Sequence, residues 1–188
     1  MLETVPAFSY IPQLFRMEGD YLTYDDGTVQ GHLGVDVSQF QGEIDWEQAA
    51  DAGVEFAIVR VGGRGYTEGK LYEDTYFDRN VQGALDAGLA VGAYFFSQAI
   101  TVEEALEEAQ FVLERVRDYD LTMPVVFDWE MVSDSSARTN AIDSDTMNEV
   151  ALAFCGAIQE AGYESMIYFN SYHCLLYTSP SPRDPKTS

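Results

Sequence analysis

The fold class is decided by AVGAYFFS (90–97) and MPVVFDWE (123–130), two short apolar runs that flank a helix expected over residues 102–116. Almost continuous apolar character is typical of strands that are buried on both faces of a parallel sheet. Between the two runs, apolar residues recur at helical spacing, and Thr101 and Glu104 form an N-terminal capping pair. This order of strand, helix and strand predicts a unit with two parallel strands.

The same alternation continues in both directions from this unit. Further strands are expected over LGVDVSQF (33–40), FAIVRVGG (56–63) and ESMIYFNSYH (164–173), and further helices over 45–53, 74–88 and 145–161. Five strands that alternate with helices predict an α/β protein with a parallel sheet, either an open doubly wound sheet or a barrel. A doubly wound nucleotide-binding fold needs a glycine-rich turn after its first strand, and none is present there. GGRGYTEG (62–69) has Glu68 where the motif needs its last glycine, so we expect a turn there and prefer the barrel.

The regions on either side of this pattern differ from it. Residues 1–32 are weakly periodic and are interpreted as an N-terminal extension, and residues 33–175 as the barrel. Residues 176–188 are rich in proline and lack periodicity, so we expect them to be disordered.

The composition limits the classes of partner. The chain has 188 residues, and its 32 Asp and Glu against 10 Lys and Arg give a net charge of −22. Nucleic acids and anionic membranes are bound through basic surfaces, so neither is expected to be a partner. A hydrophobic content of 46%, with aromatic residues making up 13% of the chain, excludes a disordered acidic tail. No apolar run is long enough to span a membrane, and the first residues do not resemble a signal peptide.

Polar and aromatic side chains gather at the ends of the expected strands, where the active sites of parallel barrels lie. The candidates are Asp36, Tyr94, Phe96, Asp128, Glu130, Tyr168 and Asn170, and Gln98 also follows a strand end. Since side chains alternate along a strand, Asp128 and Glu130 share one face, with Cα atoms roughly 7 Å apart. Two close carboxyl groups raise the pKa of one of them, and an acid beside a carboxylate is what cleavage of a glycosidic bond requires.

Other interpretations of Asp128 and Glu130 remain open. The pair could cap a helix or form salt bridges with Arg60 or Arg64, and together with Asp36 it could bind a hard cation. His32 lies before the first strand and His173 at the end of the fifth, so no histidine-rich metal cluster is indicated, and we expect neither a metal nor another cofactor. The acids within the helix over 102–116, which are Glu103, Glu104, Glu107 and Glu108, are interpreted as a solvated outer face. No serine or cysteine nucleophile is indicated, and Cys155 and Cys174 are expected to be buried thiols.

The chain from about 33 to 173 resembles the lysozymes of glycoside hydrolase family 25, which are 1,4-β-N-acetylmuramidases. GVDVSQFQGEIDW, FAIVRVGGRGY, AGLAVGAYFFS, PVVFDWE and MIYFNSY carry the resemblance, in order and in spacing. It implies a flattened (β/α)5(β)3 barrel that acts, as a monomer, on the glycan strands of bacterial peptidoglycan. It also implies an extracellular or cell-surface location, with any export signal upstream of Met1.

The resemblance also implies roles for the candidate residues. Glu130 would be the general acid, and Asp128 would orient the substrate's N-acetyl group in a retaining, substrate-assisted reaction. Asp36 would line the site. Sugar contacts would come from Tyr94, Phe96, Tyr168 and Asn170.

Two features depart from the family pattern. Phe95 stands where the family often has histidine. After the fifth strand the family continues into three further strands with another active-site aspartate, whereas here CLLYTSPSPRDPKTS (174–188) follows. We therefore expect a C-terminally truncated member with an open barrel, which is poorly soluble and inactive when expressed alone.

Overall fold

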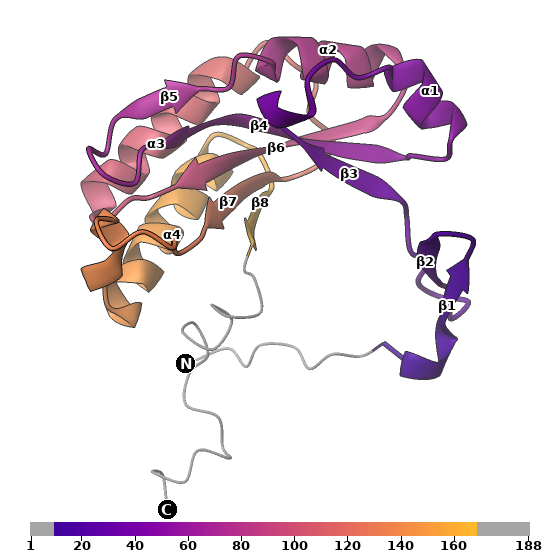
Figure 1. Cartoon of the computed structure of the whole chain (residues 1–188), viewed down its shortest axis with the longest axis horizontal. Coiled ribbons are helices and arrows are strands. Elements are labelled where there is room, and N and C mark those ends of the chain that lie inside the picture. The colour runs from indigo at the N-terminus through magenta and orange to yellow at the C-terminus, as the bar shows by residue number, and fades with distance from the viewer. Residues whose placement is uncertain (1–9, 169–188) are drawn as a thin grey trace, which may run out of the picture.

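The computed structural model describes residues 10–168. A small antiparallel hairpin of β1 (Phe15–Glu18) and β2 (Tyr21–Tyr24) comes first and lies apart from the main sheet (Figure 1). The main sheet contains β3 (Gly34–Val37), β4 (Phe56–Arg64), β5 (Leu71–Glu73), β6 (Ala90–Ser97), β7 (Val125–Trp129) and β8 (Ser165–Tyr168). The helices are α1 (Trp46–Asp51), α2 (Phe77–Asp86), α3 (Val102–Val116) and α4 (Ser144–Glu160), with short 3-10 turns at Pro12–Leu14, Gln39–Gln41 and Arg138–Ala141.

The predicted α/β class is confirmed. Strands β3, β4, β6, β7 and β8 lie side by side in that order and are all parallel, and β5 pairs with β4 in the antiparallel direction. The described strands form an open, curved sheet and do not close into a barrel, and the helices lie along its outer face (Figure 1). The last part of the strand expected over 164–173 and the tail over 176–188 lie outside the described residues.

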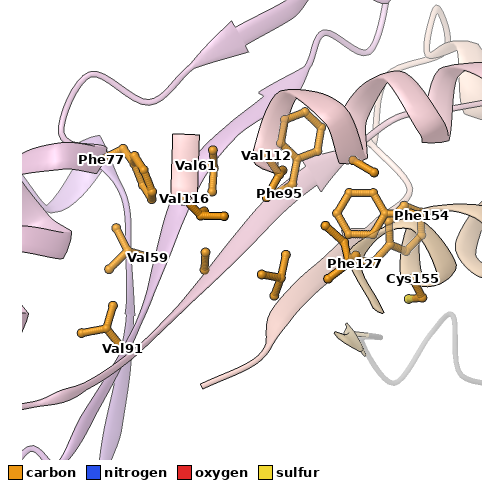
Figure 2. Packing of buried hydrophobic residues seen from close by; sticks show 14 of the residues in the cluster. Val59, Val61, Phe77, Val91, Phe95, Val112, Val116, Phe127, Phe154 and Cys155 are labelled. Carbon is orange, nitrogen blue, oxygen red and sulfur yellow. The ribbon is translucent and has the colours of Figure 1, made fainter. Parts of the chain in front are cut away.

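The core fills the space between the sheet and the helices. Figure 2 shows side chains of β4, β6 and β7 meeting those of α3 and α4, among them Phe127 and Phe154, whose ring centroids are 5.1 Å apart. Cys155 is a buried free thiol, as expected, and Cys174 lies outside the described residues. Among residues 10–168, no helix is both long and apolar enough to cross a bilayer.

Strand β4 differs from a regular strand at its centre. Its register against β6 shifts between Arg60 and Gly62, so that Val61 is an extra residue without a partner in β6. The strand also runs through Gly62 and Gly63, and the turn expected over 62–69 is confined to its second half. A Cβ atom on Gly62 would collide with the carbonyl oxygen of Tyr72, which explains why glycine is needed where β5 approaches.

The solvated acidic face predicted for α3 is correct for Glu103 and Glu107, which are exposed, and wrong for Glu108. Glu108 is fully buried, and its carboxylate accepts hydrogen bonds from Arg64 at 2.7 Å and from Ser97 at 2.6 Å. Glu107 also accepts from Arg64, and Glu104 forms an ion pair with Arg138. The sequence prediction placed Glu108 outward because it assumed no partner for this acid. The buried Arg64 of β4 supplies that partner, so the carboxylate can be buried.

Candidate active site

A cavity of about 680 Å³ opens on the face of the sheet opposite the helices. Its lining comes from the strands β3, β4, β6, β7 and β8, together with the residue that follows β7. The lining residues are Asp36, Ile58, Arg60, Tyr94, Phe96, Val126, Asp128, Glu130, Met166, Ile167 and Tyr168. Six of the seven predicted site residues therefore share one cavity, and the seventh, Asn170, lies outside the described residues.

The alternation of β7 explains how the two acids reach this cavity. Val125, Phe127 and Trp129 are fully buried against the helices, so the residues between and after them face the opposite side. In the sheet register, Asp128 lies between Phe96 of β6 and Tyr168 of β8. The predicted D-x-E arrangement thus places both carboxyl groups at the carboxyl ends of the parallel strands.

Asp128 has an unusual electrostatic environment. Burial, the nearby charges of Glu130 and Asp36, and a weaker opposing effect of Arg60 together raise its pKa to about 7. Its Oδ1 atom is buried and has no hydrogen-bond partner among the described residues. Near neutral pH both the acid and the carboxylate form of this group are therefore populated.

The tyrosines of the cavity stay protonated. Burial raises the pKa of Tyr94 to about 12, assisted by the charges of Asp128 and Asp36 against that of Arg60. Burial likewise raises the pKa of Tyr168, and the carboxylates of the cavity add to the effect. Both phenols can therefore donate hydrogen bonds to a ligand at any physiological pH.

The arginines considered as partners of the D-x-E pair are engaged elsewhere. Arg60 donates from Nε to Oδ2 of Asp74 at 2.7 Å, and its Nη2 atom lies 2.7 Å from the same oxygen. Arg64 pairs with Glu108 and Glu107 on α3. Within the described residues, the salt bridges of these two arginines are thus made with acids other than Asp128.

Some lining residues were not predicted from the sequence. Arg60 and Ile58 lie on the cavity face of β4, and Val126 and Met166 lie on the same face of β7 and β8. The period of two along each strand is a signal that could have found them. In the described part of the chain, no group of three or more His, Cys, Asp or Glu side chains is arranged to hold a metal ion.

The fold and the cavity define an α/β protein with an acidic, aromatic site at the carboxyl ends of parallel strands. The chain belongs to the glycosyl hydrolases family 25, whose family model matches residues 35–179.

Individual proteins are similar to the chain, one in sequence and two in fold. The chain is 37% identical over 79 residues to Lysozyme M1 of Streptomyces globisporus, an alignment that covers 42% of this chain and 25% of that protein. Its structure is similar to that of the modular autolysin LytC of Streptococcus pneumoniae, with a TM-score of 0.68 at 21% identity. The match covers 87% of this chain and 39% of that chain. The family 25 glycosyl hydrolase from Bacillus anthracis gives a TM-score of 0.66 at 21% identity. That match covers 88% of this chain and 72% of the hydrolase chain. The chain spans between 25% and 38% of the length of the first curated relatives that it matches.

Proposed function

We propose that residues 33–175 form the catalytic part of a muramidase that cleaves the β-1,4 bond between N-acetylmuramic acid and N-acetylglucosamine in peptidoglycan. The observation that carries the proposal is the cavity in which Asp36, Asp128 and Glu130 meet, in a chain of family 25. The relatives named a lysozyme and an autolysin agree with a substrate in the bacterial cell wall and with an extracellular or cell-surface site of action. We expect the enzyme to act as a monomer.

In the proposed reaction, Glu130 protonates the leaving glycosidic oxygen. The acetamido oxygen of the substrate attacks the anomeric carbon as the bond to that oxygen breaks, which gives a cyclic oxazolinium intermediate. Water then opens this intermediate, with Glu130 taking back a proton, and the configuration at the anomeric carbon is retained.

Asp128 would act on the acetamido group. Its carboxylate can accept the N–H of that group and stabilise the positive charge that develops on the ring. Its raised pKa means that ionisation is costly in the empty cavity and becomes favourable when this positive charge appears. Such a group stabilises the transition state more than the ground state, which is the condition for raising the rate.

The neutral surfaces of the cavity suit a sugar. Tyr94 and Tyr168 offer hydroxyl donors, and Phe96 offers an apolar face for a pyranose ring. Among the described residues that line the cavity, one is basic, Arg60, and it is paired with Asp74. These properties support a ligand that is recognised through hydroxyl and acetamido groups.

The test measures the release of reducing ends from purified peptidoglycan. Because the chain covers only part of its relatives, the assay uses this chain and also a fusion that continues after residue 168 with the C-terminal part of the Bacillus anthracis hydrolase. We expect Glu130→Gln to lower kcat about 100-fold or more. The control is Glu164→Gln, an exposed change of the same kind directly before β8, which should leave the rate unchanged.

Other outcomes would favour other functions. A folded protein that binds glycan strands without releasing reducing ends would indicate a non-catalytic glycan-binding relative. Activity that survives Glu130→Gln would contradict the assignment of the acid. Activity that is abolished by EDTA would favour the metal-dependent alternative.

A further inference from the structure

A buried glutamine connects the ends of two strands at the cavity. Gln98 follows β6 directly, and it is fully buried. Its Nε2 atom donates to the carbonyl oxygen of Ser97 at 2.9 Å and to that of Glu130 at 2.7 Å. Its Oε1 atom accepts from the hydroxyl of Thr139 at 3.0 Å.

These three bonds fix the amide of Gln98 in one orientation. Two carbonyl oxygens require donors, and the amide nitrogen supplies its two hydrogens to them, while the amide oxygen faces a hydroxyl that can donate. Turning the amide over would set an oxygen against two oxygens in a fully buried place, where unpaired polar groups are costly. The amide therefore acts as a rigid link.

One side of this link is firmly anchored. Ser97 donates through its hydroxyl to Glu108 at 2.6 Å, and Glu108 is held by Arg64. The hydroxyl of Ser97 also accepts from the backbone N–H of Ala99 at 3.2 Å. The end of β6 is therefore fixed by a buried ion pair, and Gln98 extends from this fixed point.

The other side of the link is the backbone of Glu130. The register between β6 and β7 ends at the pair of Ser97 and Trp129, so Glu130 lies one residue beyond the paired strands. The amide of Gln98 bridges the two strand ends at that next position. It thereby holds the backbone from which the Glu130 side chain reaches the cavity.

We propose that Gln98 is a positioning residue for Glu130. This inference rests on the proposed function, because it states how the general acid of that reaction is held in place. Gln98 does not line the cavity. It acts through the Glu130 carbonyl, and Thr139 keeps its amide in the productive orientation.

The inference is tested first without any assay of activity. Gln98→Met has a similar volume but lacks all three hydrogen bonds, and Thr139→Val removes only the hydroxyl that orients the amide. The backbone N–H of Met131 and the carbonyl of Glu130 belong to the same peptide group. The chemical shift of Met131 in ¹H–¹⁵N NMR spectra therefore reports on the hydrogen bond that the Glu130 carbonyl oxygen accepts from Gln98. We expect this resonance to move clearly in Gln98→Met and less in Thr139→Val, and to stay in place in the control Gln110→Met on the exposed side of α3.

A Met131 resonance that is the same in the two variants as in the unchanged chain would overturn the inference. If Gln98→Met fails to fold, the result for Thr139→Val decides alone, since loss of one hydroxyl is a mild change. Because no substrate is needed, this experiment stands even if the proposed hydrolysis is not observed.

The second test separates positioning from a general structural role. Misplacement of a reacting group lowers kcat, and we expect Gln98→Met to reduce it by roughly ten- to a hundredfold while KM stays the same. In a Glu130→Gln background the same substitution should have no further effect, because the group that it positions is gone. Additive losses in the double variant would overturn the inference, whereas activity that survives Glu130→Gln would instead count against the proposed function.

Discussion

At the scale of single residues, the cavity depends on the alternation of side chains along β7. The sequence was sufficient to predict that Asp128 and Glu130 share a face, because a strand has a fixed period of two. The presence of Arg60 in the cavity lining could not be predicted in the same way. Its orientation depends on an irregular register in β4 and on its partner Asp74, which follows β5, and neither is visible in a local pattern.

The pKa of Asp128 leads to a prediction about stability. Between pH 4 and pH 7 the folded protein holds a proton on Asp128 that the unfolded chain releases, so this group lowers the free energy of unfolding as the pH rises through that range. Asp128→Asn removes the effect. At pH 8 the variant should melt at a higher temperature than the unchanged protein, and its free energy of unfolding should be larger by at most about 4 kcal/mol. This difference should shrink towards pH 4.

Thermal melts by circular dichroism across this pH range provide the measurement. Asp118→Asn, an exposed change of the same chemistry, serves as the control. If Asp128→Asn raised the free energy of unfolding equally at pH 4 and pH 8, the ionisation of Asp128 would not be the cause of the added stability.

At the scale of elements, α3 shows where periodicity is informative and where it fails. Its bounds, its capping residue Thr101 and its apolar stripe were all predictable, since each is a local property of the chain. The burial of Glu108 was not, because it depends on Arg64, which lies 44 residues away in sequence. Burial raises the pKa of Glu108 to about 7 in spite of its hydrogen bonds from Ser97 and Arg64.

Removal of one partner of this pair should be costly. In Glu108→Ala, Arg64 keeps its buried position but loses the carboxylate at its Nε atom. We expect the free energy of unfolding in urea to fall by about 3–5 kcal/mol. On the same helix, the exposed Glu114→Ala should change it by no more than about 0.5 kcal/mol, and a similarly small loss at Glu108 would refute the role of the pair.

At the scale of the whole molecule, the order of layers follows from the alternation of strands and helices. The sequence predicted a barrel left open by the absence of the last strands of the family pattern, and the described strands do not close into a barrel. The antiparallel β5 was not predictable, since three residues are too few to show a period. The hairpin of β1 and β2 was likewise too short and too exposed to give a pattern.

The open sheet leads to a prediction about association. Among the described strands β8 pairs only with β7, and Met166 and Tyr168, which it contributes to the cavity lining, are 45% and 46% exposed. An exposed apolar edge favours pairing between chains. The monomer expected for the active enzyme requires this edge to be covered. With the edge uncovered, we expect the chain to self-associate as its concentration rises, and Met166→Lys to increase the monomer fraction in light scattering after gel filtration.

The matched control is Leu152→Lys, which changes an exposed apolar residue on α4. This substitution lies away from the strand edge and should have a smaller effect. Equal effects of the two substitutions would indicate that general surface charge, and not the edge of the sheet, governs association.

The extra residue in β4 has a consequence for the two arginines of that strand. Arg60 and Arg64 are four positions apart, so in a regular strand both would point to the same side of the sheet. Insertion of Val61 into the register inverts the phase of everything after it, and Arg64 turns to the helices while Arg60 stays at the cavity. A single unpaired residue thus places the two arginines on opposite faces of the sheet. Arg60 offsets part of the negative charge of the cavity acids, and Arg64 binds Glu108 of α3, which in turn accepts a hydrogen bond from Ser97 of β6.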